Sequence, residues 1–229
     1  VDIAGSLTGL GSLLRDEGRL DEARELLVEA AELNARVYAG SHLELGRSYN
    51  ALGMLAYSRS LYDEAAGWFG QAHAVLAATI GADNSGTLRT LNNLAVVLHR
   101  AGRLDESQRL FEQVIATRLA AGGDQTADLA LSAKGLGWVL LDRGHLVRAD
   151  SLLSSALATL EANPALGAAP LAEARLGVGA CRLRQGRLAE AGRLVLPATE
   201  ELATVYEPGH EMVRRGRELL RELARRQGR

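Results

Sequence analysis

The sequence predicts an all-α protein built from repeated helix pairs, and three observations indicate this fold. A short turn segment recurs every 42 residues along the 229-residue chain, without insertion or deletion. On both sides of each turn, apolar residues recur at spacings of three and four, which is typical of amphipathic helices. Small residues also recur at fixed places within each unit. A constant period of this length is the sequence signature of a repeat protein.

Each predicted unit contains a turn that reads Gly-Arg-Leu-Asp-Glu-Ala or a variant of it. The turns begin at Gly18, Ser60, Gly102, Gly144 and Gly186. Glycine at this place allows the left-handed backbone conformation that ends many helices. Acidic residues after the turn, such as Asp21 and Glu22, then lie where the dipole of the next helix favours negative charge. Each unit is therefore predicted to be two helices joined by a tight turn.

A column of small residues lies seven positions before each turn, at Gly11, Gly53, Ala95, Gly137 and Gly179. Glycine inside a helix costs about 0.5–1 kcal/mol relative to alanine, so its repeated use indicates a compensating contact. A second small column lies in the second helix, at Ala23, Ala65, Ser107, Ala149 and Ala191. We expect the two columns to face each other, so that the helix axes approach to the short end of about 8–10 Å.

These columns resemble the tetratricopeptide repeat (TPR), and the spacing of 42 is similar to the kinesin-light-chain-like version, here of bacterial type. That version carries a Gly-x-x-His-Pro-like linker before each first helix. Gly40-Ser41-His42 matches it in part, Gly209-His210 retains the Gly and His, and no proline follows in any copy. The resemblance implies an all-α, right-handed α-α superhelix, a TPR solenoid of five helix pairs plus a C-terminal capping helix.

We expect one array over residues 1–229, with repeats at about 1–41, 42–83, 84–125, 126–167 and 168–209 and a capping helix at about 210–226. Val1 is in register with Leu43 and Ser85, which indicates a chain cut at a repeat boundary from a longer protein, of which this would be the C-terminal part. The arginine-rich last helix is typical of a polar cap that closes a solenoid core. Pro197 predicts a kink in the last second helix.

The composition argues against several function classes. The formal charge of −2, from 26 basic and 28 acidic residues, lacks the basic footprint of a nucleic-acid-binding protein. No apolar run approaches the roughly 18 residues that would insert into a membrane. We therefore expect no nucleic acid, no membrane insertion of this part and a cytoplasmic location.

No catalytic or metal-binding pattern is present. No histidine pair has ligand spacing, and no carboxylate cluster accompanies the histidines, which are His42, His73, His99, His145 and His210. The single cysteine, Cys181, excludes an internal disulfide and is interpreted as a small packing residue. We expect no enzyme activity, no cofactor and no metal.

The resemblance implies that the first helices line the concave side, and one stripe of them remains after the packing columns are removed. Its candidate peptide-binding residues are Arg47, Asn50, Met54, Tyr57, Arg89, Asn92, Asn93, Val96, His99, Arg100, Lys134 and Trp138. Asparagine amides pair with both groups of a peptide bond, and the basic residues favour an acidic segment. Trp138 is the expected hot spot, although an aromatic residue at helical spacing is more often core.

The favoured function is a non-catalytic protein–protein interaction scaffold that binds a partner segment in its concave groove. Two alternatives stay open. The array could be the regulatory or sensor region of a larger bacterial signalling enzyme, such as a serine/threonine kinase or a caspase-like peptidase, which are known to carry such repeats. It could also be a self-assembly module. The sequence does not fix the oligomeric state.

Overall fold

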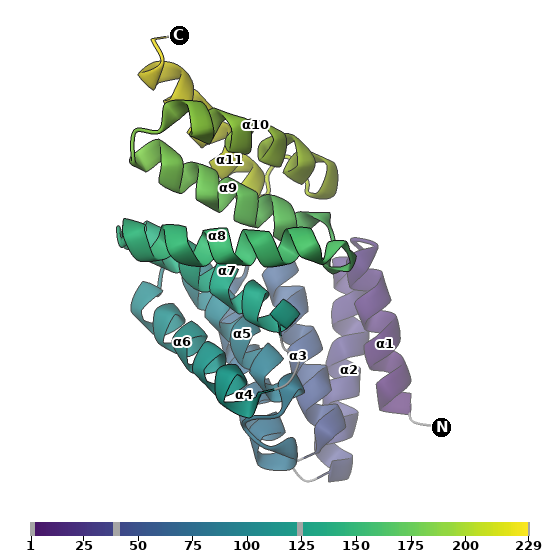
Figure 1. Cartoon of the computed structure of the whole chain (residues 1–229). Helices are drawn as coiled ribbons and strands as arrows, with labels where there is room; N and C mark the ends of the chain where they lie inside the picture. The colour runs from purple at the N-terminus through teal and green to yellow at the C-terminus, as the bar shows by residue number, and fades with distance from the viewer. Residues whose placement is uncertain (1–2, 39–41, 123–125, 229) are drawn as a thin grey trace. The chain divides into compact units, whose positions relative to one another are not determined.

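The computed structural model describes residues 3–38, 42–122 and 126–228, and within these ranges the chain is helical and contains no β-strand (Figure 1). The all-α prediction is confirmed. Ten helices form five consecutive pairs, and an eleventh follows them in the described part of the chain.

The chain forms two compact units, residues 1–121 and 122–229. Unit 1 holds α1 Ile3–Asp16, α2 Leu20–Tyr38, α3 Leu43–Ser58, α4 Tyr62–Ile80, α5 Ser85–Arg100 and α6 Leu104–Ala121. Unit 2 holds α7 Thr126–Asp142, α8 Leu146–Ala162, the 3-10 turn η1 Pro164–Leu166, α9 Ala168–Arg184, α10 Leu188–Val205 and α11 Glu211–Arg226. Within each unit, a first helix packs on its own second helix, and that second helix packs on the next first helix.

The turns have the predicted left-handed conformation. Gly18, Gly102, Gly144 and Gly186 have φ between 77° and 81°. Ser60 has the same conformation with φ 59°, although its side chain disfavours it. The repeated geometry therefore overrides the local preference of serine.

The glycine column makes a closer contact than the sequence indicates. A Cβ atom placed on Gly53 would lie 2.8 Å from the ring of Phe69, and one on Gly11 would lie 2.7 Å from Leu27. The expected contact between the two small columns is also present: the Ser107 hydroxyl donates to the Ala95 carbonyl at 2.7 Å, and a Cβ atom on Gly11 would lie 3.3 Å from the Ala23 carbonyl oxygen. In addition, the glycine makes room for a large side chain of the second helix.

The histidines of the linker cap the N-termini of the helices that follow them. His42 Nδ1 accepts from the Glu44 N–H at 3.2 Å, and His210 Nδ1 accepts from the Met212 N–H at 3.3 Å. The Asn84 side chain makes the same cap at α5. Gly40 and Ser41, the other residues of the first linker match, lie outside the described residues.

The last helix has the expected polar outer surface. Its inner face buries Met212, Val213, Gly216 and Leu223. Before it, α10 continues past Pro197 as one helix, and the kink there stays a prediction.

Candidate functional site

In unit 1, helices α3 and α5 bring three of the polar side chains together. The Thr90 hydroxyl donates to Asn50 Oδ1 at 3.4 Å, and Asn93 Nδ2 donates to the same oxygen at 3.5 Å. Among the described residues, the Asn50 Nδ2 group makes no hydrogen bond, so its two N–H donors remain available. This arrangement brings together Asn50 and Asn93, two of the predicted residues, on adjacent first helices.

A cavity of about 380 Å³ lies beside these side chains. We call it the Arg89 cavity, and it is lined by Leu43, Arg47, Asn50, Leu76, Ile80, Asn84, Ser85, Gly86, Arg89 and Thr90. Its apolar surface comes from Leu43 and from the C-terminal end of α4. Its polar surface includes the first turn of α5, where the helix dipole adds partial positive charge.

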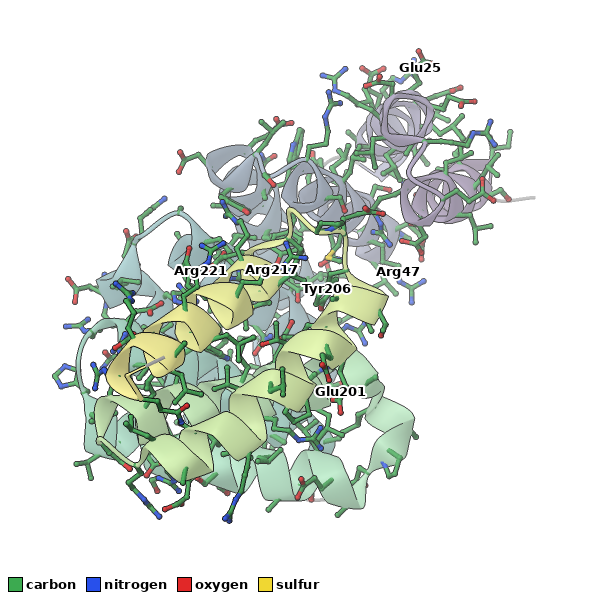
Figure 2. All side chains as sticks on the ribbon, turned by 90° about the horizontal axis from the view of Figure 1, so that it is seen from above. Glu25, Arg47, Glu201, Tyr206, Arg217 and Arg221 are labelled. Atoms are coloured by element: carbon green, nitrogen blue, oxygen red, sulfur yellow. The ribbon has the colours of Figure 1, made fainter. Side chains whose placement is uncertain are left out.

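Two arginines at this cavity differ in their pairing. Arg47 Nη1 lies 2.7 Å from the Glu44 carboxylate, and the Arg47 side chain extends into solvent (Figure 2). Arg89 is exposed and makes no ion pair within the part of the chain that the structure describes. The cavity therefore combines an apolar wall with a free guanidinium.

The other predicted residues of unit 1 fall into two groups. Asn92, Val96, His99 and Arg100 are half-buried along α5. Met54 and Tyr57 pack against the core cluster around Phe69 and are not part of the Arg89 cavity.

In unit 2 the expectation that Trp138 is an accessible binding residue is wrong. Trp138 is only 6% exposed, and its Nε1 donates to the Glu173 carbonyl at 3.2 Å. The Arg215 guanidinium lies 5.2 Å from the centre of its ring, within the range of a cation–π contact. The position of Trp138 on α7 alone suggested a groove wall, but α9 and α11 cover the side chain.

Lys134 is also occupied by the fold. Its ammonium group pairs with the Glu173 carboxylate, and both side chains are largely buried. The Tyr206 hydroxyl donates to the same carboxylate at 2.9 Å, and the Tyr206 ring stacks on the His210 ring with a centroid separation of 3.8 Å. Arg215 in turn pairs with Asp142 at 2.8 Å and Glu211 at 2.7 Å. We call these side chains the unit 2 network.

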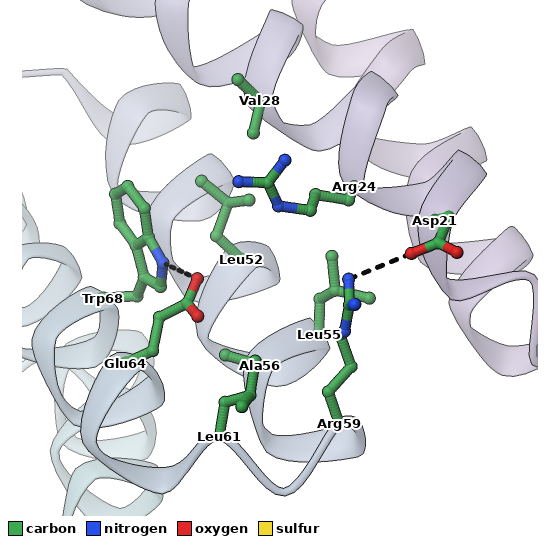
Figure 3. A pocket seen from close by; sticks show the side chains of 10 residues that line it. All are labelled: Asp21, Arg24, Val28, Leu52, Leu55, Ala56, Arg59, Leu61, Glu64 and Trp68. Atoms are coloured by element: carbon green, nitrogen blue, oxygen red, sulfur yellow. Dashed lines mark hydrogen bonds and ion pairs between the residues drawn. The ribbon is translucent and has the colours of Figure 1, made fainter.

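Two further grooves, which the sequence did not reveal, lie between successive second helices of unit 1. The first, of about 380 Å³, lies between α2, α3 and α4 (Figure 3). At its rim, Arg59 lies 3.2 Å from Asp21, and the Trp68 Nε1 donates to Glu64 at 3.3 Å. The second, of about 500 Å³, is one repeat further on and includes Leu110 in place of Trp68.

The Trp68 ring contacts the Tyr49 ring, and the two centroids lie 5.6 Å apart. Trp68 is half-buried and also lines the first groove. Its column otherwise holds leucine, so no pattern in the sequence indicates that this side chain reaches a surface.

Burial shifts the pKa values of two titratable groups in the interior. Burial raises the pKa of the Cys181 thiol to about 12, which leaves it protonated and unreactive. Burial also lowers the pKa of His73, against a smaller opposite effect of the Thr87 backbone. Among the residues that the structure describes, no group of three or more His, Cys, Asp or Glu side chains could hold a metal ion.

The fold and these surfaces define an α-solenoid of helix-pair repeats with open clefts between its helices. A model of the tetratricopeptide repeat matches residues 2–78 and 79–162, so the chain belongs to the tetratricopeptide-repeat family. Proteins of this family are generally non-catalytic scaffolds for protein–protein interaction. Among curated proteins, none matches the sequence significantly.

Solved structures with this fold include kinesin-light-chain-like repeats, as the resemblance implied. A putative kinesin light chain of Podosopora anserina has 20% identity and a TM-score of 0.70, covering 89% of this chain and 96% of that one. BtubC (BKLC) of P. vanneervenii has 21% identity and a TM-score of 0.71, covering 90% and 82%. YrrB, a TPR protein with an unusual peptide-binding site, has 16% identity and a TM-score of 0.54, covering 95% and 93%. Within the described ranges, every helix is too short or too polar to span a bilayer.

Proposed function

We propose that this chain is a non-catalytic scaffold that binds an acidic segment of a partner protein at the Arg89 cavity. The observation that carries the proposal is the exposed Arg89, which has no ion pair among the described residues and lies at a cavity with an apolar wall. A scaffold function is general in the family, and the location and charge preference are specific to this chain.

The chemistry of the cavity favours a segment with an acidic side chain next to an apolar one. A carboxylate can accept two N–H bonds from a guanidinium, which adds geometry to charge. The apolar neighbour would pack on Leu43, Leu76 and Ile80. The free Asn50 Nδ2 would donate to a carbonyl of the bound backbone.

A synthetic fluorescent peptide in which leucine alternates with glutamate tests this proposal by fluorescence anisotropy. We expect it to bind more tightly than the same peptide with glutamine, and binding should weaken as salt is raised. The Arg89→Glu variant should reduce affinity about tenfold or more, equivalent to about 1.4 kcal/mol. Its helicity and melting should not change, because Arg89 is exposed and makes no ion pair among the described residues.

The matched control is Arg193→Ala, which removes an exposed arginine on α10, far along the sequence from the cavity. This variant should bind the glutamate peptide as the wild type does. Equal affinity of the wild type and the Arg89→Glu variant for the glutamate peptide would contradict the site. Equal affinity for the glutamate and glutamine peptides would contradict the proposed charge preference.

A further inference from the structure

Helix α11 carries a row of arginines on its solvent-exposed side. Arg214, Arg217, Arg221 and Arg225 are all exposed, and their spacings of three, four and four place them on one face of the helix. Figure 2 labels Arg217 and Arg221 on α11. None of the four makes an ion pair among the described residues, and Glu218 is the one exposed acidic residue of the helix. We call these four side chains the arginine stripe, in which positive charge is in excess.

The arginine stripe includes positions that are small or apolar in the earlier first helices. The position of Arg214 holds Ala172 in α9 and Leu88 in α5, and both of these residues are buried. The position of Arg221 holds the buried Gly179 in α9. An arginine at such a position does not allow the close helix contact that the small residue makes, and its charge requires water or an opposite charge. This face of α11 therefore has the chemistry of a surface that meets solvent or a negatively charged partner.

Helix α2 of unit 1 carries the opposite charge in a row of its own. Glu25, Glu29 and Glu32 are exposed, and their spacings of four and three place them on one face of the helix. Figure 2 labels Glu25. None of the three carboxylates makes an ion pair among the described residues, and the nearby Arg36 donates to the Glu32 backbone carbonyl at 3.3 Å. We call these three side chains the glutamate stripe.

The glutamate stripe lies on a side of the second helices that faces solvent in every repeat. The equivalent positions of the other second helices are all exposed apart from the half-buried Pro197, and they hold Gly67, Gln71, Ala74, Arg109, Gln113, Ala116, Ser151, Ser155, Ala158, Arg193, Pro197 and Glu200. Glu200 is the one acidic residue among them. Exposure of this side is therefore a property of the repeat, whereas its acidic character is specific to α2.

The two stripes match in spacing when the helices that carry them run antiparallel. From Glu25 to Glu29 to Glu32 the intervals are four and three residues. From Arg221 back to Arg217 and Arg214 they are also four and three. With a helical rise of about 1.5 Å per residue, both stripes have intervals of about 6 Å and about 4.5 Å. Three guanidinium groups can therefore meet three carboxylates at the same time.

We propose that the arginine stripe of one copy of this chain docks on the glutamate stripe of a second copy, with α11 and α2 antiparallel. A single surface ion pair is weak, but several pairs held in one geometry form a network, and an arginine can bind a carboxylate through two parallel N–H bonds. Each copy offers one stripe of each sign, so the contact is head-to-tail and continues from copy to copy unless a ring closes. Neither stripe includes a residue of the Arg89 cavity, so this inference does not rest on the proposed function.

Sedimentation velocity of the full chain tests this contact at ionic strengths of about 0.01 M and about 1 M, where the Debye length is about 30 Å and about 3 Å. The weight-average sedimentation coefficient should rise with protein concentration at the low ionic strength and stay constant at the high one. Arg217→Glu with Arg221→Glu should weaken the association at least tenfold, and so should Glu25→Arg with Glu29→Arg. A chain with all four substitutions has exchanged these charges between its stripes and should associate as the unmodified chain does.

The matched control, Arg109→Glu with Arg193→Glu, reverses two exposed arginines outside both stripes and should leave the association unchanged. Circular dichroism checks that each variant folds, which we expect because every replaced residue is exposed. Sedimentation that does not depend on concentration at low ionic strength would overturn the proposal. Association that is lost on changing the arginines but not the glutamates would assign α11 to a different acidic surface and would also overturn it. So would a folded chain with all four substitutions that stays monomeric.

Discussion

In unit 1, Arg47 and Arg89 line an open cavity, whereas Glu173 and Arg215, at the same register position in unit 2, are engaged within the fold. These four residues form one column spaced by multiples of 42, and Gly5 and Leu131 complete it. The same position therefore serves two purposes. In unit 2, neighbouring first helices supply the opposite charge, and the residues at this position stabilise the unit. In unit 1 they do not, and the arginines at this position are available to a partner.

The column that contains Trp138 shows the same contrast between the two units. Met54, Val96 and Trp138 are in register, and only Trp138 is fully buried. Its indole is held by a backbone carbonyl of α9 and covered by a guanidinium of α11. We infer from this contrast that substitutions on the first helices affect stability in unit 2 and binding in unit 1.

The largest expected effect is that of Trp138→Ala. Removing a buried aromatic side chain costs about 3–5 kcal/mol in unfolding free energy. Urea denaturation followed by circular dichroism measures this loss. The control Tyr57→Ala in unit 1 removes a half-buried ring and should cost about 1 kcal/mol. Equal losses in the two variants would remove the contrast between the units.

An intermediate effect is expected for Lys134→Ala. It leaves the largely buried Glu173 carboxylate with the Tyr206 hydroxyl but without its cation, which costs about 1–3 kcal/mol. The control Arg47→Ala breaks a pair whose arginine is exposed and should change stability by no more than about 0.5 kcal/mol. The same denaturation measurement applies, and a neutral Lys134→Ala would mean that the unit 2 network does not stabilise the fold.

The smallest expected change in stability concerns the turns of the two units. Ser60 in unit 1 has a left-handed backbone conformation that its side chain disfavours. Ser60→Gly removes this unfavourable contribution and should raise the unfolding free energy by about 1 kcal/mol. Gly144→Ser in unit 2 makes the reverse change at φ 81° and should lower it by a similar amount. Thermal melting checks both. Shifts of the same sign would show that the two turns are not equivalent.

The sequence alone could predict the helix pairs because their signals are local or strictly periodic. Gly102 and Gly144 marked turns through their backbone freedom, and Gly53 marked a close contact through its cost inside a helix. The additional contact of Gly53 with Phe69 was not predictable in this way, because Phe69 and Ala65 lie on the same side of α4, one turn apart.

The candidate site was predictable only in part. Arg89 and Asn50 were found because a helical wheel places them away from the packing columns. Trp138 was placed wrongly, since its burial depends on Glu173 and Arg215, which are 35 and 77 residues away in the sequence. A wheel describes one helix, and it contains no information on which neighbours fold over it.

The sealed thiol of Cys181 has a practical consequence for studying the cavity. Because it is the only cysteine and is both buried and protonated, it should not react with maleimides in the folded protein. A cysteine introduced at the exposed Ser85, which lines the cavity, would then be the single labelling position. A fluorophore attached there would report directly on what enters the cavity, without any other residue having to be replaced.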